Sequence, residues 1–208
     1  VPVLGNRYPA PIIIQLGFTM ATVVWSLIEQ QVRAWLEHFV VGLNLCPFAS
    51  PVVSSDGLRI KICESTELEQ IMQTFLTELD LIQSTSELDI ATTLLVIPNA
   101  LGNFEEYLDV IDLAETLLIE AGLEGIIQLA SFHPLYQFDG EPEESASHFS
   151  NRSPYPLVHL LREDMMASAL SSFPNPQTIP LKNISTLESI GREEIQRRWN
   201  QIAGDNAK

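Results

Sequence analysis

Three short segments with the residue types of buried strands, separated by two stretches with helical spacing, limit the possible folds of this chain more than any other feature. The segments span residues 58–64, 92–97 and 126–132. Short, largely apolar runs of this length are typical of strands in the interior of a sheet. Each intervening stretch is long enough for one helix. The sequence therefore predicts the order β-α-β-α-β.

Both intervening helices have start signals. Thr66 and Glu69 form a capping box before the first helix, and Asn103 precedes the second, which we expect to end at Ala121 with Gly122 just beyond it. Two β-α-β connections of this length imply parallel strands covered by helices. We therefore expect an α/β fold with a small, mostly parallel β-α-β-α-β sheet in a single domain. The alternative is a ferredoxin-like α+β sandwich, in which a further strand from the chain ends pairs antiparallel.

Helical spacing predicts three further helices. One follows a capping box at Ser26 and ends near Gly42, and another covers residues 156–171. The last is capped by Ser185 and continues to about Trp199.

The pattern also predicts the limits of the domain. We expect residues 26–200 to form one α/β domain and residues 201–208 to form a C-terminal tail. Residues 1–25 are interpreted as an N-terminal extension, because the chain begins with Val1 and has Met20 just before the first patterned helix. A start site assigned too far upstream would produce this arrangement.

The charge of the chain excludes some classes of partner. The 208 residues include 27 acidic and 11 basic side chains, which gives a formal net charge of -16. This charge repels nucleic-acid phosphates and anionic lipids, so we expect neither nucleic acid nor a membrane as a partner. Two cysteines are too few for a disulfide framework and favour a cytoplasmic location. The oligomeric state does not follow from the sequence.

Polar residues gather where the third predicted strand ends. Parallel sheets bind ligands outside the carboxyl ends of their strands, where Pro98 and Asn99 from the second strand would also lie. His133 leaves the third strand directly before Pro134, a position that suits acid–base catalysis. The alternative is a histidine that hydrogen-bonds a loop carbonyl.

Cys46 is the candidate nucleophile. It lies in a turn fixed by Pro47, and a thiol beside a histidine can form the reactive thiolate. The alternative is a small buried residue without a chemical role. Cys63 lies inside the first predicted strand and is expected in the core.

The segment 151–156 has an unusual sequence, NRSPYP, directly before the predicted helix 156–171. The free N–H groups at a helix start attract anions, and Arg152 can donate paired hydrogen bonds to a carboxylate or phosphate. The alternative is that Arg152 neutralises the acidic run 141–144. The other residues expected to bind the substrate are Asn151, Ser153, Tyr155 and Tyr136.

His159 and Arg162 are three residues apart and would share one face of the predicted helix 156–171. We expect both at the binding site, with Arg162 as a second anion clamp. The alternatives are a core or interface histidine and an arginine paired with Glu163 or Asp164. The sequence has no HxH, HExxH or CxxC spacing, so no metal site is predicted, and it names no cofactor.

Five longer strings allow a comparison with a known family. They are NLCPFA at residues 44–49, ATTLLVIP at 91–98, GLEGIIQLASFHPLYQF at 122–138, NRSPYPLVHLLRE at 151–163 and IPLKNISTL at 179–187. With these strings the chain resembles the bacterial family known as domain of unknown function fourteen-fifteen, over about Ser26 to Trp199. The resemblance implies a bacterial protein of one domain and no established activity. The polar positions inside its motifs are Cys46, His133, Tyr136, Gln137, Asn151, Arg152, Ser153, Tyr155, His159, Arg162 and Asn183.

Together these observations favour an enzyme that acts on a small anionic metabolite. His133 would be the acid–base group, Cys46 the nucleophile, and the two arginines the anion clamps. The alternative is a non-catalytic regulatory module that binds a small molecule or a protein through the same residues. In a third interpretation these residues only hold the loops in place.

Overall fold

The computed structural model describes residues 27–203, so the expectations for residues 1–25, for Ser26 and for the end of the C-terminal tail lie outside the described residues. Its centre is a sheet of four strands, β1 (Leu58–Ile62), β2 (Thr92–Val96), β3 (Ile127–Phe132) and β4 (Leu157–Arg162). The first three lie within the segments that the sequence predicts. The fourth does not.

The sheet has the strand order β1-β2-β4-β3. β1 pairs in parallel with β2, whereas β4 pairs antiparallel with both β2 and β3. The α/β class is confirmed, but the expectation of a mostly parallel sheet is wrong because the sheet is mixed. Val96, Leu157 and Phe132 lie side by side in the register, so β1, β2 and β3 end, and β4 begins, at one edge. We call this the carboxyl edge.

β4 corrects the prediction of a helix over residues 156–171. Residues 157–162 form a strand, and only Glu163–Ser171 form a helix, α5. β4 lies between two other strands and is covered on both faces, so its apolar residues do not alternate with polar ones as they do in a half-exposed strand. A short apolar run of this kind has no periodicity that separates strand from helix.

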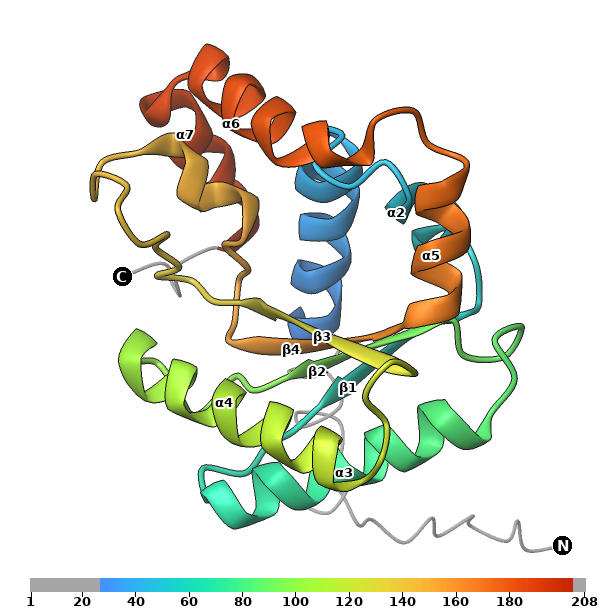
Figure 1. Cartoon of the computed structure of the whole chain (residues 1–208). Helices are drawn as coiled ribbons and strands as arrows, with labels where there is room; N and C mark the ends of the chain where they lie inside the picture. Colours follow the sequence, from blue (N-terminus) through green and yellow to red (C-terminus); the bar gives the residue numbers. More distant parts are fainter. Residues whose placement is uncertain (1–26, 204–208) are drawn as a thin grey trace, which may run out of the picture.

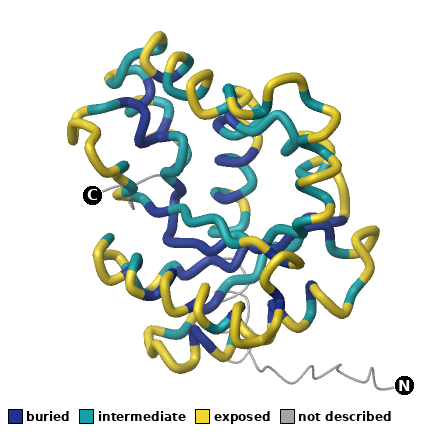
Figure 2. The backbone as a smooth tube through the Cα atoms, in the orientation of Figure 1, coloured by how far each residue is buried: buried dark blue, intermediate teal, exposed yellow. Residues whose placement is uncertain are grey.

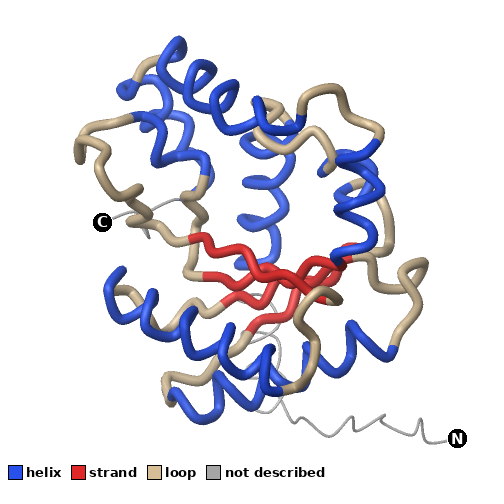
Figure 3. The backbone as a smooth tube through the Cα atoms, viewed as in Figure 1, coloured by secondary structure: helices blue, strands red, loops and turns tan. Residues whose placement is uncertain are grey.

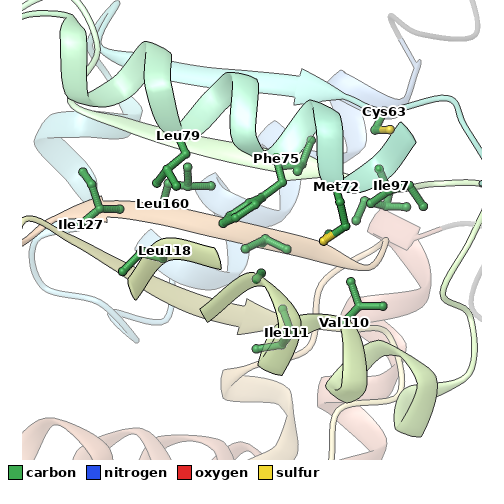
Figure 4. Packing of buried hydrophobic residues seen from close by; sticks show 14 of the residues in the cluster. Cys63, Met72, Phe75, Leu79, Ile97, Val110, Ile111, Leu118, Ile127 and Leu160 are labelled. Carbon is green, nitrogen blue, oxygen red and sulfur yellow. The ribbon is translucent and has the colours of Figure 1, made fainter. Parts of the chain in front are cut away.

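Helices cover both faces of the sheet (Figures 1 and 3). On one face lie α3 (Leu68–Ser84) and α4 (Phe104–Glu120), whose apolar side chains point toward the sheet and toward one another (Figure 4). On the other side lie a helix over residues 27–35, the π-helical turn η1 (Leu36–Val41) that continues it, and the short helix α2 (Ala49–Val53). α5 lies on this side too, together with the two C-terminal helices (Figure 1).

The two C-terminal helices are α6 (Ile179–Ile190) and α7 (Arg192–Ala203). The sequence predicts one helix from Ser185, but Gly191 separates the two with a φ of 85°, which few other residues adopt. Two 3-10 turns complete the described chain, η2 (Ala146–Ser150) and η3 (Pro176–Thr178).

Of the two predicted helix starts, one is confirmed and one is wrong. The Asn103 side chain accepts a hydrogen bond from the Glu106 N–H, so the predicted cap of α4 is confirmed. The capping box at Thr66 is wrong, because α3 begins at Leu68 and its N-cap residue, Glu67, makes no side-chain capping bond. Burial is deepest in the middle of the sheet, where all five residues of β2 are buried (Figure 2).

Candidate functional site

A cleft of about 1190 Å³ opens at the carboxyl edge of the sheet. Most of its lining comes from the segment 98–105 after β2, the segment 134–137 after β3, the segment 152–156 before β4, and α7, and Glu143 lies at it as well. As the sequence predicts, the segments that follow the second and third strands meet at this edge. We call this space the carboxyl-edge cleft.

Arg152 is the most unusual residue of the cleft. Its side chain is half-buried, its Cζ atom lies 4.5 Å from the centre of the Phe149 ring, and its Nε–H donates to the Tyr136 carbonyl at 3.3 Å. It forms no ion pair with any carboxylate of residues 27–203, and its two terminal nitrogens donate to no described residue. The acidic run 141–144 therefore does not neutralise it, although the sequence allowed that alternative.

Arg192, at the start of α7, brings a second guanidinium to the cleft. Burial and the repulsion from Arg192 lower the pKa of Arg152 to about 10, so Arg152 stays charged at neutral pH. Arg192 itself donates to the Glu143 carbonyl at 3.2 Å and pairs with Glu144 at 3.5 Å. An anion between the two guanidiniums would relieve their repulsion.

The start of α4 and two glutamates also affect the electrostatic potential of the cleft. α4 begins at the cleft, and the partial positive charge of a helix start favours anions. The negative charges of Glu105 and Glu143 oppose the positive charges of Arg152, Arg192 and the helix start. Both glutamates are exposed, so solvent and salt screen their charges more than the charge of half-buried Arg152.

His133 lies beneath the cleft and does not line it. The side chain is 0% exposed and stacks near Phe104 and Tyr107, with ring centroids at 5.2 and 5.0 Å. The Leu135 N–H donates to Nδ1 at 3.0 Å, so the proton of the neutral ring belongs on Nε2, which donates to the Leu101 carbonyl at 2.9 Å. Burial lowers the pKa of His133 and keeps the ring neutral.

These bonds use both ring nitrogens of His133. The carbonyl that it holds belongs to Leu101, whose φ of 59° lies in the left-handed region that non-glycine residues seldom adopt. His133 thus fixes the loop 98–103, which forms one wall of the cleft. The alternative interpretation of His133, a histidine that hydrogen-bonds a loop carbonyl, matches this geometry.

The residues beside Arg152 also make structural bonds. The Ser153 hydroxyl is buried and donates to the Tyr155 carbonyl at 2.6 Å. Tyr155 lines the cleft, but its hydroxyl donates to the Gln31 side chain on the helix of residues 27–35. The Asn151 amide donates to the Ser131 carbonyl at 3.3 Å.

Tyr136 packs its ring between two other aromatic rings, with centroid distances of 5.1 Å to both Phe104 and Phe138. Asn183, a polar motif position far along the chain, donates to the Leu45 carbonyl at 2.8 Å and so fixes the turn before Cys46. Gln137 is exposed and lines the cleft. Of the predicted binding residues, Arg152 and Tyr155 line the cleft, and Asn151, Ser153 and Tyr136 support its walls.

Three predicted site residues lie elsewhere. His159 and Arg162 are on strand β4, so residues three apart point to opposite faces of the sheet, and the prediction of a shared helical face is wrong. Arg162 is at the end of β4 opposite the carboxyl edge and donates to the carbonyls of Ile82, Thr85 and Ile90 at 2.6–2.9 Å. It pairs with neither Glu163 nor Asp164.

Cys46 and His159 line a separate cavity on the face of the sheet that the helix of residues 27–41 and α5 cover. His133 lines neither that cavity nor the cleft, so the structure does not bring Cys46 and His133 to a common space. Burial raises the pKa of the Cys46 thiol, and the backbone N–H groups of Phe48 and Ala49 partly oppose this shift. The thiol is therefore protonated at neutral pH. Cys63 is buried, as expected.

Sequence reasoning missed two residues of the site. Arg192 lies far from the central motifs in the chain, and only the fold of α7 brings it to the cleft. Tyr107 is fully buried, accepts from the Phe132 N–H at 2.9 Å and donates to the Leu157 carbonyl at 2.7 Å, so its hydroxyl joins the end of β3 to the start of β4. Its position on the apolar face of α4 gave no signal of this role.

Within residues 27–203, no three side chains of His, Cys, Asp or Glu are placed to hold a metal ion. No helix in the same range is both long and apolar enough to cross a membrane.

Comparison with known proteins identifies a family. The family model described as "Protein of unknown function (DUF1415)" matches residues 27–197. This match confirms the family resemblance that the sequence strings indicate. No curated protein and no solved structure is similar enough to the chain to count as a match.

Proposed function

We propose that this chain, which belongs to the DUF1415 family of proteins of unknown function, binds a small anionic metabolite in the carboxyl-edge cleft. The observation that carries the proposal is Arg152, a half-buried guanidinium that opens into a cleft without an ion-pair partner among the described residues. A buried cation without a counter-charge is costly, and a ligand carboxylate or phosphate would supply that charge.

The rest of the lining suggests the class of ligand. Asn99 and Asn103 each use one amide atom within the fold, and their other amide atoms and the Gln137 side chain offer donors and acceptors for hydroxyl or carbonyl groups. Leu135, 56% exposed, offers an apolar contact. A carboxylated or phosphorylated metabolite with further polar groups fits this set. No histidine or cysteine of residues 27–203 lines the cleft. Binding is therefore better supported than catalysis, and catalysis by His133 and Cys46 stays a prediction.

The test measures thermal stability with phosphate, pyrophosphate, citrate and short dicarboxylates in low salt. An anion that binds should raise the midpoint of the wild-type protein, by a stabilisation of about 2.7 kcal/mol at one hundred times its dissociation constant. Arg152→Met should abolish the shift, and Arg192→Met should reduce it.

The matched control is Arg33→Met, which removes the same charge from a helix surface where Arg33 pairs with Glu29. This variant should respond to the anion as the wild-type protein does. An equal response of the Arg152 and Arg33 variants would contradict the proposed site, because non-specific charge effects would then explain the shift.

A further inference from the structure

A second cavity, of about 350 Å³, lies between the sheet and the helices on the face opposite α3 and α4. Its walls come from the helix of residues 27–41, from α2, from α5 and from all four strands, and they are almost entirely apolar. A cavity of about 150 Å³ holds a benzene molecule, so this one has room for a ligand of roughly twice that size. We call it the apolar cavity.

The side chains of residues 27–203 leave this space unfilled, although it lies between packed elements. Protein interiors are packed as densely as organic crystals, and unfilled volume lowers stability. The aromatic rings of Trp35 and Phe132 contact each other at one wall, with centroids 5.3 Å apart, and Met165 and Met166 line another. Flexible methionine side chains adapt to ligands of different shape.

Among the described residues, the His159 ring gives the cavity a polar atom that is available to a ligand. The Thr92 hydroxyl donates to the Leu160 carbonyl at 2.7 Å, so its oxygen must accept the hydrogen bond from His159 Nε2, also at 2.7 Å. This network puts the ring proton on Nε2 and leaves a lone pair on Nδ1. No residue of the described chain donates to Nδ1.

His159 lines this apolar space. The residue stays partly accessible, and its unbonded Nδ1 is not one of the fully buried polar atoms without a partner among the described residues. Burial lowers the pKa of His159 to about 4, so the ring is a neutral acceptor at physiological pH. The Cys46 thiol, protonated for the same reason, adds a polarizable wall without a charge.

We propose that the apolar cavity binds a neutral, mostly apolar molecule with one hydroxyl group, such as a medium-chain alcohol or an alkylphenol, whose O–H donates to His159 Nδ1. A carboxylate is disfavoured because Arg162, the cationic residue among the described residues of the lining, has its guanidinium bonded to three backbone carbonyls outside the cavity. The site is separate from the carboxyl-edge cleft and does not depend on the function proposed for it.

The first test is a calorimetric titration with straight-chain 1-alkanols from hexanol to dodecanol and with sodium octanoate. Affinity should rise about fourfold per added methylene until the cavity is full and then level off. Octanoate should bind at least tenfold more weakly than octanol. A steady rise through dodecanol, or equal binding of octanoate, would show a general surface or detergent-like effect and overturn the proposal. So would the absence of binding by every alcohol.

Two leucine variants of α5 locate the bound alcohol. Ala169 lines the cavity, whereas Ala167 is exposed on the same helix. Ala169→Leu should fill part of the cavity and weaken octanol binding at least tenfold, and Ala167→Leu should leave it unchanged. Equal affinities of the two variants would place the alcohol outside the cavity.

His159→Phe tests the hydrogen bond, because phenylalanine keeps a ring of similar shape without the nitrogen. Octanol affinity should fall about tenfold, while the affinity for an alkylbenzene of similar size stays within twofold. A parallel fall for both ligands would overturn the role of Nδ1.

A labelling experiment on the wild-type protein avoids any folding defect of the variants. Bound octanol should slow the reaction of N-ethylmaleimide with Cys46 and leave the rate at Cys63, which is buried in the core on the other face, unchanged. Protection of neither thiol would contradict binding in this cavity.

Discussion

The carboxyl edge and the opposite end of β4 each have a partly buried arginine, and the two side chains are used differently. Arg162 donates to three backbone carbonyls, whereas Arg152 donates to one and opens into a cleft. His133 and His159 differ in the same way. His133 has both ring nitrogens bonded, while His159 keeps one nitrogen for a cavity. The candidate binding residues are therefore distinguished by side-chain donors or acceptors that no other described residue uses. Residue type and place in a motif distinguish them less well.

The largest expected effect is on His133. His133→Ala should lower the free energy of unfolding by about 3–4 kcal/mol, because it leaves a cavity, the Leu101 carbonyl without its donor and the Leu135 N–H without its acceptor. Urea denaturation at pH 7.5 measures this loss. The control His38→Ala, at an exposed histidine, should change stability by less than about 0.5 kcal/mol. Similar stabilities of the two variants would mean that the bonds of His133 contribute little to the fold.

The second prediction concerns pH and His159. The pKa of His159 is 6.5 in the unfolded chain and about 4 in the folded one, so the unfolded state binds the proton first as pH falls. Above about pH 6.5 His159 is neutral in both states and does not lower the free energy of unfolding. Between about pH 6.5 and pH 4 that free energy falls, by about 3 kcal/mol in total.

His159→Phe should remove this part of the acid dependence. The lowered pKa of His133 acts in the same direction but is present in both proteins, so the difference between their pH profiles isolates His159. Urea denaturation between pH 4 and pH 8 gives both profiles. Two parallel profiles would show that His159 is solvated rather than buried.

The sequence predicted the elements that have local signals and missed those set by tertiary contacts. Three strands and the cap at Asn103 follow from apolar runs and capping chemistry. The segment of β4 predicts a helix, because a strand covered on both faces has no alternation of apolar and polar residues. A helix would put His159 and Arg162 on one face, whereas β4 points them to opposite faces.

The candidate site was predicted to a similar extent. The edge of the sheet and Arg152 were expected, because a topological rule places ligands there and the NRSPYP segment is unusual. Arg192 and Tyr107 could not be found, since no rule on sequence alone relates α7 or the buried face of α4 to the end of β3. The local sequence around His133 could not show that both nitrogens would meet backbone groups.

The third prediction tests the difference between the two arginines directly. Arg162→Met should destabilise the protein by about 2–3 kcal/mol, because three partly buried carbonyls lose a charged donor. Arg152→Met should change stability by less than about 0.5 kcal/mol, since it removes a desolvated cation without an ion-pair partner among the described residues. Urea denaturation of both variants at pH 7.5 provides the comparison. A larger loss for Arg152→Met would make Arg152 a structural residue and weaken the proposed anion site.

The smallest expected effect is on Thr92, whose hydroxyl fixes the proton of His159. Thr92→Val keeps the shape of the side chain and should lower stability by about 1 kcal/mol, because the Leu160 carbonyl and the His159 Nε2–H each lose a partner.

In the wild-type protein His159 offers the cavity only an acceptor, so 2-octanol should bind about tenfold more tightly than 2-octanone, which has no O–H.

In Thr92→Val the Nε2–H no longer has a fixed acceptor, so the ring can take either tautomer and offer a donor or an acceptor to the cavity. The preference for 2-octanol over 2-octanone should therefore fall to about threefold or less, measured by calorimetry on both proteins. An unchanged preference would show that the ring proton is not controlled by Thr92. The contrast between His133, whose two nitrogens are fixed by backbone groups, and His159, whose one free nitrogen is defined by a single hydroxyl, would then need another explanation.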